Sequence, residues 1–178
     1  PDTLRVIANA VTGEGAGSPS FTIGSGITVT WGCNHRHIRI EDNTITAWPA
    51  VGVDLVQCAD TRLTCNVIND NKVGVRHERS IAQTGGKNHL KWNTVHGSAS
   101  FNLEALESQY IALGDAPKST GNDVRLATNA FNLKKLPTGS PDLDARYTYW
   151  RDAAGLLITT DPLIRATFDP NGGVATVD

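Results

Sequence analysis

Several residue types are scarce or absent in this chain of 178 residues. It contains no methionine, only three cysteines and 6% aromatic residues. An odd number of cysteines without metal-ligand spacing argues against a disulfide framework. We therefore expect free, buried or half-buried thiols, and a single bridge between Cys33 and Cys58 stays open. Because methionine is missing throughout, we also expect the chain to be a fragment of a larger polypeptide.

Charge of one sign and long apolar runs are also lacking. The net charge is −2, and the 16 Lys and Arg residues are scattered without a basic stripe, so we predict no nucleic-acid partner. No apolar run approaches the roughly 20 residues of a membrane span, and no signal peptide is visible. His35 and His37 form a His-x-His pair without an evident third ligand. We predict neither a metal nor a cofactor.

A six-residue motif is present four times: an apolar residue, two residues of any kind, an asparagine, one more residue and an apolar residue. Its asparagines are Asn43, Asn66, Asn93 and Asn129, spaced by 23, 27 and 36 residues. A period in the twenties is typical of a solenoid, in which each repeat adds one coil. Asparagine suits a bend between strands, because it tolerates left-handed backbone and its amide satisfies backbone groups. We expect the asparagines of stacked coils to hydrogen-bond in a ladder.

Short segments rich in β-branched residues predict strands across most of the chain. They include Phe21–Ile23, Ile27–Trp31, His37–Ile40, Val51–Val56 and Lys72–Arg76. The stretch 103–113 fits either a helix or a strand that runs into an enlarged loop. An all-β fold follows, either a β-helix or an antiparallel β-sandwich. The sandwich gives no reason for asparagine to recur at one phase, so we favour the β-helix.

The four motifs, with Gly52-Val53 and Gly74-Val75, resemble the right-handed parallel β-helix family of pectate-lyase-like proteins over about residues 27–132. That fold is widespread in polysaccharide lyases, glycoside hydrolases and phage tailspikes. The resemblance implies a right-handed single-stranded parallel β-helix of about four coils.

Three regions are expected along the chain. They are the coils in 1–133, a linker in 134–145 rich in Pro and Gly, and a small antiparallel meander in 146–178. A solenoid must cap its open ends, and the meander could be that cap. Its resemblance to tailspike modules implies a homotrimer, located in a virion tail or outside the cell.

By resemblance, the third strand of each coil floors the ligand groove. Strand alternation then predicts an outward row on that strand, formed by Asp54, Arg76, Glu78, Asn102 and Glu104. Carboxylates one coil apart, as expected for Asp54 and Glu78, would suit a retaining glycosidase at about 5 Å. Carboxylates two coils apart, as expected for Asp54 and Glu104, would suit an inverting one at about 9 Å.

These carboxylates are our candidate catalytic acids and bases for a glycoside hydrolase or a lyase. Arg76 and Asn102 are candidate substrate-binding residues, with Arg76 suited to an acidic sugar. The alternative is an ordinary solvated sheet face with paired charges. Trp48 and Trp92 either stack on sugar rings or fill the core.

The prediction for function is a polysaccharide-binding or polysaccharide-degrading part of a phage tailspike-like protein. Its partner would be a capsule, O-antigen or exopolysaccharide. The alternative is a non-catalytic structural or trimerisation segment of a spike or adhesin, because about four coils are few for a complete polysaccharide-processing enzyme.

Overall fold

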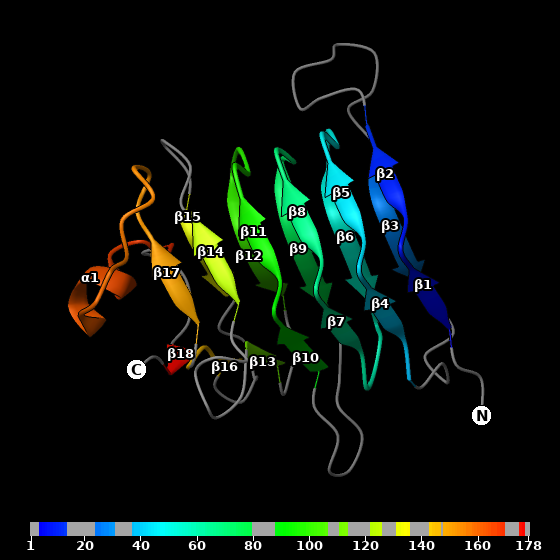
Figure 1. Cartoon of the computed structure of the whole chain (residues 1–178). Helices are drawn as coiled ribbons and strands as arrows, with labels where there is room; N and C mark the ends of the chain where they lie inside the picture. Colours follow the sequence, from blue (N-terminus) through cyan, green and yellow to red (C-terminus); the bar gives the residue numbers. More distant parts are fainter. Residues whose placement is uncertain are drawn as a thin grey trace.

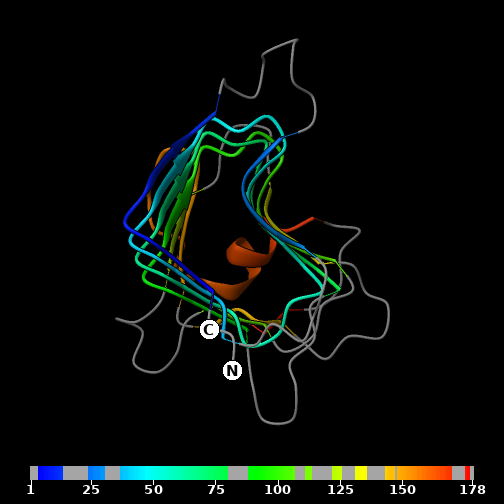
Figure 2. The ribbon, with the colours of Figure 1, turned by 90° about the vertical axis from the view of Figure 1, so that its right-hand side faces the viewer.

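The chain folds into a parallel β-solenoid with three sheets along its length (Figures 1 and 2). The computed structural model describes residues 4–13, 24–30, 37–79, 88–106, 111–113, 122–125, 131–135, 143–146, 148–169 and 175–176. Within these residues, the strands of all three sheets pair in parallel. The predicted all-β parallel solenoid is confirmed, and the antiparallel sandwich is wrong.

Successive coils contribute strands to the three sheets in turn. Sheet A contains β1 (Arg5–Ile7), β4 (Arg39–Glu41), β7 (Arg62–Thr64), β10 (Asn88–Lys91), β13 (Ile111–Leu113), β16 (Leu143–Asp144) and β18 (Ala175–Thr176). Sheet B contains β2 (Ala10–Thr12), β5 (Thr44–Thr46), β8 (Val67–Asn69), β11 (Thr94–His96), β14 (Asp123–Arg125) and β17 (Tyr149–Arg151). Sheet C contains β3 (Ser25–Thr30), β6 (Val51–Val56), β9 (Val73–Glu78), β12 (Phe101–Leu106) and β15 (Phe131–Lys135). The stretch 103–113 is therefore strand where it is described, and the helix alternative is wrong.

A ladder of asparagine amides fills the corner between sheets A and B, as predicted. Nδ2 of Asn43 donates to Oδ1 of Asn66 at 3.0 Å, and Nδ2 of Asn66 donates to Oδ1 of Asn93 at 2.8 Å. Each amide also reaches a carbonyl of the preceding coil, as Asn66 does to Ile40 O at 2.8 Å. These groups are buried, so each bond avoids the roughly 1–3 kcal/mol cost of an unsatisfied group.

The next rung of the ladder is Asn122, not Asn129 as the motif predicted. Oδ1 of Asn122 accepts from Nδ2 of Asn93 at 2.9 Å, and its own Nδ2 donates to Leu90 O at 2.9 Å. Asn122 lies directly before β14, the phase that Asn93 has before β11. Leu113 pairs with Leu90 in the register, but it lies nine residues before Asn122, whereas Leu90 lies three residues before Asn93. The six-residue motif therefore does not detect Asn122. Asn129 lies outside the described residues.

Asn9 forms a further rung, because its Nδ2 donates to Oδ1 of Asn43 at 3.1 Å. The left-handed backbone at this corner belongs to the residue before each of the rungs Asn9, Asn43, Asn66 and Asn93. Ala8, Asp42, Cys65 and Trp92 have φ between 54° and 58°, whereas the sequence suggested that asparagine would take this conformation. A left-handed residue other than glycine costs roughly 1–2 kcal/mol, which the buried amide bonds offset. The side chains of Cys65 and Trp92 are exposed at this corner.

The interior consists of aliphatic side chains stacked in register from coil to coil. Ile40, Leu63 and Leu90 form one such row on sheet A, and each is at most 1% exposed. The strands bend at further corners, where Gly52 and Gly74 allow close approach. A Cβ on Gly52 would lie 2.7 Å from Gly74 O, and one on Gly74 would lie 2.5 Å from Asn102 O. Glycine is therefore required here by contact with the next coil.

His77 also faces the interior, level with Leu55 and Ala105 on the neighbouring strands of sheet C. Its side chain is buried beside Val75 and Leu103. Burial lowers the pKa of His77 to about 4, because the apolar surroundings disfavour the charged imidazolium.

The C-terminal part differs from the predicted meander. β16 pairs in parallel with β13, and β17 pairs in parallel with β14, so the described sheets continue past residue 133. In the described residues, antiparallel pairing is limited to one bridge between Arg151 and Leu157. Within the region expected to form the meander, Asp161–Arg165 is instead the helix α1, whose early proline favours helix initiation.

This short helix covers the C-terminal end of the solenoid core. Ile164 of α1 is 2% exposed and belongs to the core cluster. Phe168 meets Trp150 edge-to-face with ring centroids 5.1 Å apart. Figure 2 shows α1 within the outline of the coils, so the cap is helical. In the described part of the chain, no helix has the length and apolar character needed to cross a membrane.

Candidate functional site

The outer face of sheet C brings three of the predicted residues into one row. Arg76 lies directly between Asp54 and Glu104 in the parallel register. Lys134 follows Glu104 in the backbone register. Glu78 lies outside this row, because it pairs with Val56 and Leu106 two positions further along β9.

Arg76 and Asp54 form a bidentate ion pair. Nε of Arg76 lies 3.0 Å from Oδ1 of Asp54, and Nη2 lies 2.7 Å from Oδ2. The Asp54 hydrogen bond, followed by the charges of Asp54, Glu104 and Glu78, raises the pKa of Arg76 against the opposing effect of burial. The sheet C row therefore holds charges of alternating sign that compensate one another.

The register decides which carboxylate spacings are available. Asp54 and Glu104 stand two strands apart at one level, which corresponds to roughly 9–10 Å between their backbones. Asp54 and Glu78 are offset by two residues as well as by one strand, which gives roughly 8 Å. The expected spacing of about 5 Å for that pair is therefore wrong, because Arg76 takes the position opposite Asp54.

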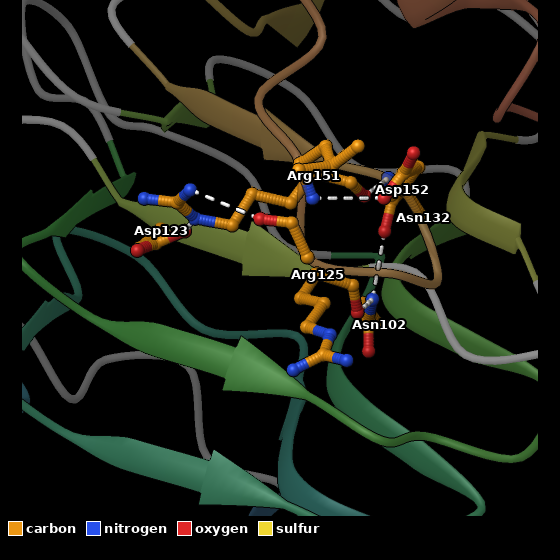
Figure 3. A network of polar contacts seen from close by, with 8 residues as sticks. Asn102, Asp123, Arg125, Asn132, Arg151 and Asp152 are labelled. Carbon is orange, nitrogen blue, oxygen red and sulfur yellow. Dashed lines mark hydrogen bonds and ion pairs between the residues drawn. The ribbon is translucent and has the colours of Figure 1, made fainter.

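Asn102 does not join the outward row. Its side chain is 1% exposed, and its Nδ2 donates to Oδ1 of Asn132 at 2.8 Å and to Arg125 O at 2.6 Å (Figure 3). Asn102 lies level with Gly74 at the bend of sheet C, because Phe101 and Leu103 flank it opposite Val73 and Val75. Strand alternation fails at this bend, so the predicted outward orientation is wrong.

The two candidate tryptophans lie in different surroundings. Trp48 is partly buried against the core, and its indole Nε1 donates to Val11 O at 3.2 Å. Trp92 is 50% exposed at the corner between sheets A and B. Trp92 is therefore available to a ligand, whereas Trp48 braces the coil beneath it.

The outer face of sheet A carries a row of basic side chains, three arginines and a histidine, that the sequence analysis did not predict. Arg5 pairs with Arg39, Arg39 with Arg62, and Arg62 with His89. Within the described ranges, Arg5, Arg39 and Arg62 form no ion pair. The expectation that the protein has no basic stripe is therefore wrong, because basic residues far apart in the sequence adjoin one another on sheet A.

The sequence did contain a signal for this row. An arginine stands four residues before each of the rungs Asn9, Asn43 and Asn66, and His89 stands four residues before Asn93. Because the rungs are in register, every residue at a fixed offset from them is in register too. These basic residues are 34, 23 and 27 residues apart along the chain, which makes them look scattered.

A groove of about 380 Å³ lies on this face, beside the cation row. It is lined by Glu41, Arg62, Thr64, His89, Lys91 and Trp92. One carboxylate therefore shares the groove with two permanent cations, an imidazole and an exposed indole. This combination can bind an anionic ligand that also presents an apolar face.

The two described cysteines are free thiols in different surroundings. Burial, followed by the charges of Asp42 and Glu41, raises the pKa of the exposed Cys65 thiol, which keeps it protonated. Cys58 is a buried free thiol, and Cys33 lies outside the described residues. Among the residues that the structure describes, no three His, Cys, Asp or Glu side chains are grouped to hold a metal ion.

Comparison of the chain with protein-family models, curated proteins and solved structures finds no match. Function is therefore inferred from the geometry of the described residues.

Proposed function

We propose that the protein binds an acidic polysaccharide along the outer face of sheet A. The observation that carries this proposal is the groove in which the exposed Trp92 lies with Arg62 and Lys91. An indole stacks on the apolar face of a sugar ring. A guanidinium binds a carboxylate through two parallel hydrogen bonds.

The length of the cation row favours a polymer over a single sugar. Arg5, Arg39, Arg62 and His89 repeat at the strand spacing of roughly 4.8 Å. A chain lying along the solenoid axis would meet one basic side chain on each coil, an arginine on three coils and His89 on the fourth. Several weak contacts on one chain then add up through a high effective concentration.

We further propose that the protein serves as a segment of a phage tailspike or a similar spike, exposed on a virion or outside a cell. The support is the resemblance of the repeat to tailspike β-helices, together with the solenoid fold. A homotrimer is the corresponding assembly. Size-exclusion chromatography with light scattering tests it, and a monomer at micromolar concentration would count against it.

A second candidate function is hydrolysis or β-elimination of the bound polysaccharide at sheet C. The spacing between Asp54 and Glu104 favours it, because inverting glycosidases separate their carboxyl groups by roughly 6.5–9.5 Å. The bidentate contact with Arg76 opposes it, since it occupies both oxygens of Asp54. A reducing-end assay on Asp54→Asn and Glu104→Gln separates the two functions: full activity in both variants excludes this catalytic pair.

The binding proposal is tested by affinity electrophoresis of the whole chain in gels that contain polygalacturonate or a neutral glucan. We expect retardation by the acidic polymer only, and weaker retardation at high salt. Trp92→Ala and Arg62→Ala should each lower the affinity about tenfold. Leu156→Ala and Arg165→Ala remove an exposed apolar and an exposed cationic side chain elsewhere, and both should bind like the wild type.

Failure to bind any of several acidic polysaccharides would contradict the proposal. Equal losses in the sheet A variants and in the two controls would do the same, because they would indicate nonspecific charge attraction.

A further inference from the structure

A second concave site lies on the outer face of sheet B, away from the sheet A groove. It has a volume of about 280 Å³ and is lined by Thr94, His96, Asp123, Arg125, Arg151 and Gly155. The residues come from three neighbouring strands and one turn. Thr94 is level with Asp123, and His96 is level with Arg125, which is level with Arg151.

The turn after β17 holds both arginines from one side. The Gly155 N–H donates to Asp152 O at 2.9 Å, and the Leu156 N–H donates to Oδ1 of Asp152 at 2.8 Å, so the turn is tightly bonded. Its carbonyls accept from the guanidinium groups: Ala153 O from Nη2 of Arg125 at 2.9 Å, and Gly155 O from Nη1 of Arg151 at 3.2 Å.

Glycine is needed at position 155 for this arrangement. Its φ is +87°, and an added Cβ would lie 3.3 Å from Cζ of Arg125. A larger residue would strain the turn and crowd the guanidinium. The sequence around the turn therefore fixes the position of Arg125.

The charges of the site are only partly compensated. Nε of Arg151 lies 2.6 Å from Oδ1 of Asp123, and this hydrogen bond raises the pKa of Arg151 (Figure 3). Arg125 forms no ion pair within the described residues, and its guanidinium donates to the neutral Ala153 carbonyl. The site thus keeps one net positive charge, next to an imidazole and a hydroxyl.

A guanidinium that is held in place while most of its N–H groups stay available is suited to a planar or tetrahedral oxyanion. Thr94 and His96 can each supply a further hydrogen bond. The volume is near the lower end of the roughly 300–1,000 Å³ found for ligand pockets, and it exceeds what one inorganic anion needs. A sugar-sized ligand that carries one anionic group fits these features.

We propose that this pocket binds a small ligand through a phosphate, sulfate or carboxylate group, with Arg125 as its main partner. The proposal does not depend on polysaccharide binding at sheet A. It assigns to the Asp152–Leu156 turn the task of holding Arg125 toward the ligand.

The test is an NMR titration of the whole chain with inorganic phosphate, sulfate, acetate and glucose 6-phosphate. We expect saturable shifts at Arg125, Gly155 and His96, with dissociation constants in the millimolar range or below and the tightest binding for the sugar phosphate. The preferred anion identifies the chemistry of the natural group.

Two substitutions and one control complete the test. Arg125→Ala should weaken binding at least tenfold. Arg125→Lys should weaken binding less, because lysine keeps the positive charge but cannot donate two parallel hydrogen bonds as a guanidinium does. Arg165→Ala, on α1, should bind these anions like the wild type. Unchanged affinity in Arg125→Ala, equal loss in Arg165→Ala, or no saturable shift with any of the four anions would overturn the proposal.

Discussion

The outer faces of sheets A and C obey the same register but distribute their charges in opposite ways. On sheet C, Arg76 lies between Asp54 and Glu104, and opposite charges meet. On sheet A, Arg39 lies between Arg5 and Arg62, and like charges meet. Directly opposed like charges on neighbouring strands destabilise a sheet, whereas opposite charges support it. Opposite charges therefore compensate one another on sheet C, whereas the arginines of sheet A adjoin one another in the register.

The largest expected effect concerns β9, where Arg76 faces outward and His77 inward. The pKa of His77 is lowered from 6.5 to about 4, so the unfolded chain takes up its proton first as the pH falls. The contribution of neutral His77 to stability is complete above pH 6.5 and is lost between pH 6.5 and 4, by roughly 3 kcal/mol.

Urea denaturation at several pH values measures this effect. His77→Leu should lose the corresponding part of the pH dependence, whereas His96→Ala on the outer face of sheet B should keep it. Parallel pH profiles for the wild type and His77→Leu would show that His77 is not held neutral in the core.

The next effect is the loss of folding stability when the ion pair on the outer face of sheet C is broken. Arg76→Ala removes the partner of Asp54, whose side chain is 8% exposed, and should cost about 2 kcal/mol. This value is below the range for fully buried pairs, because 28% of the Arg76 side chain is exposed. In Arg76→Ala/Asp54→Ala, part of the loss should return, since no buried charge is left alone.

For ligand binding, we expect the substitution on sheet A to matter and the substitution on sheet C to have no effect. Arg39→Ala should lower the affinity for an acidic polysaccharide about tenfold or less, because one contact of several is lost. Arg76→Ala should leave that affinity unchanged once the protein is shown to be folded. If Arg76→Ala abolishes binding and Arg39→Ala does not, the ligand occupies sheet C and the assignment of the two faces is reversed.

The smallest effect tests the contact between neighbouring arginines on sheet A. Without ligand, Arg62→Ser should stabilise the protein by roughly 0.2–1 kcal/mol, because a like-charge contact with Arg39 disappears. Thermal unfolding at low salt measures it, and the gain should shrink as salt is added. A clear loss of stability would mean that Arg62 is already compensated.

The repeated motif in the sequence predicted the solenoid and its asparagine ladder. It did not predict the features that depend on bends within a coil or on the length of a coil. The ladder Asn43, Asn66 and Asn93 identified the solenoid, because a buried amide at a corner has few substitutes. Alternation correctly put Asp54 and Glu104 in one row. It failed for Asn102, which lies at a bend, and motif matching failed for Asn129, because the segment before Asn122 lengthens its coil.

The sequence also did not predict which charged residues become neighbours on a sheet. Arg39 and Arg62 are 23 residues apart in the chain, and only the register makes them neighbours. The C-terminal cap could not be predicted from turn signals alone. A proline such as Pro162 fits a turn between two strands, and it fits the first turn of a helix equally well.

The asparagine ladder also has a consequence for how the solenoid forms. Oδ1 of Asn66 accepts from the coil before it, while Nδ2 of Asn66 donates to that coil and to the next. A coil therefore completes its corner only when its neighbour is in place, which couples adjacent coils in a nearest-neighbour chain. Amide protons should therefore be protected most strongly around Asn66 and Asn93, whose side-chain amides bond to a coil on each side.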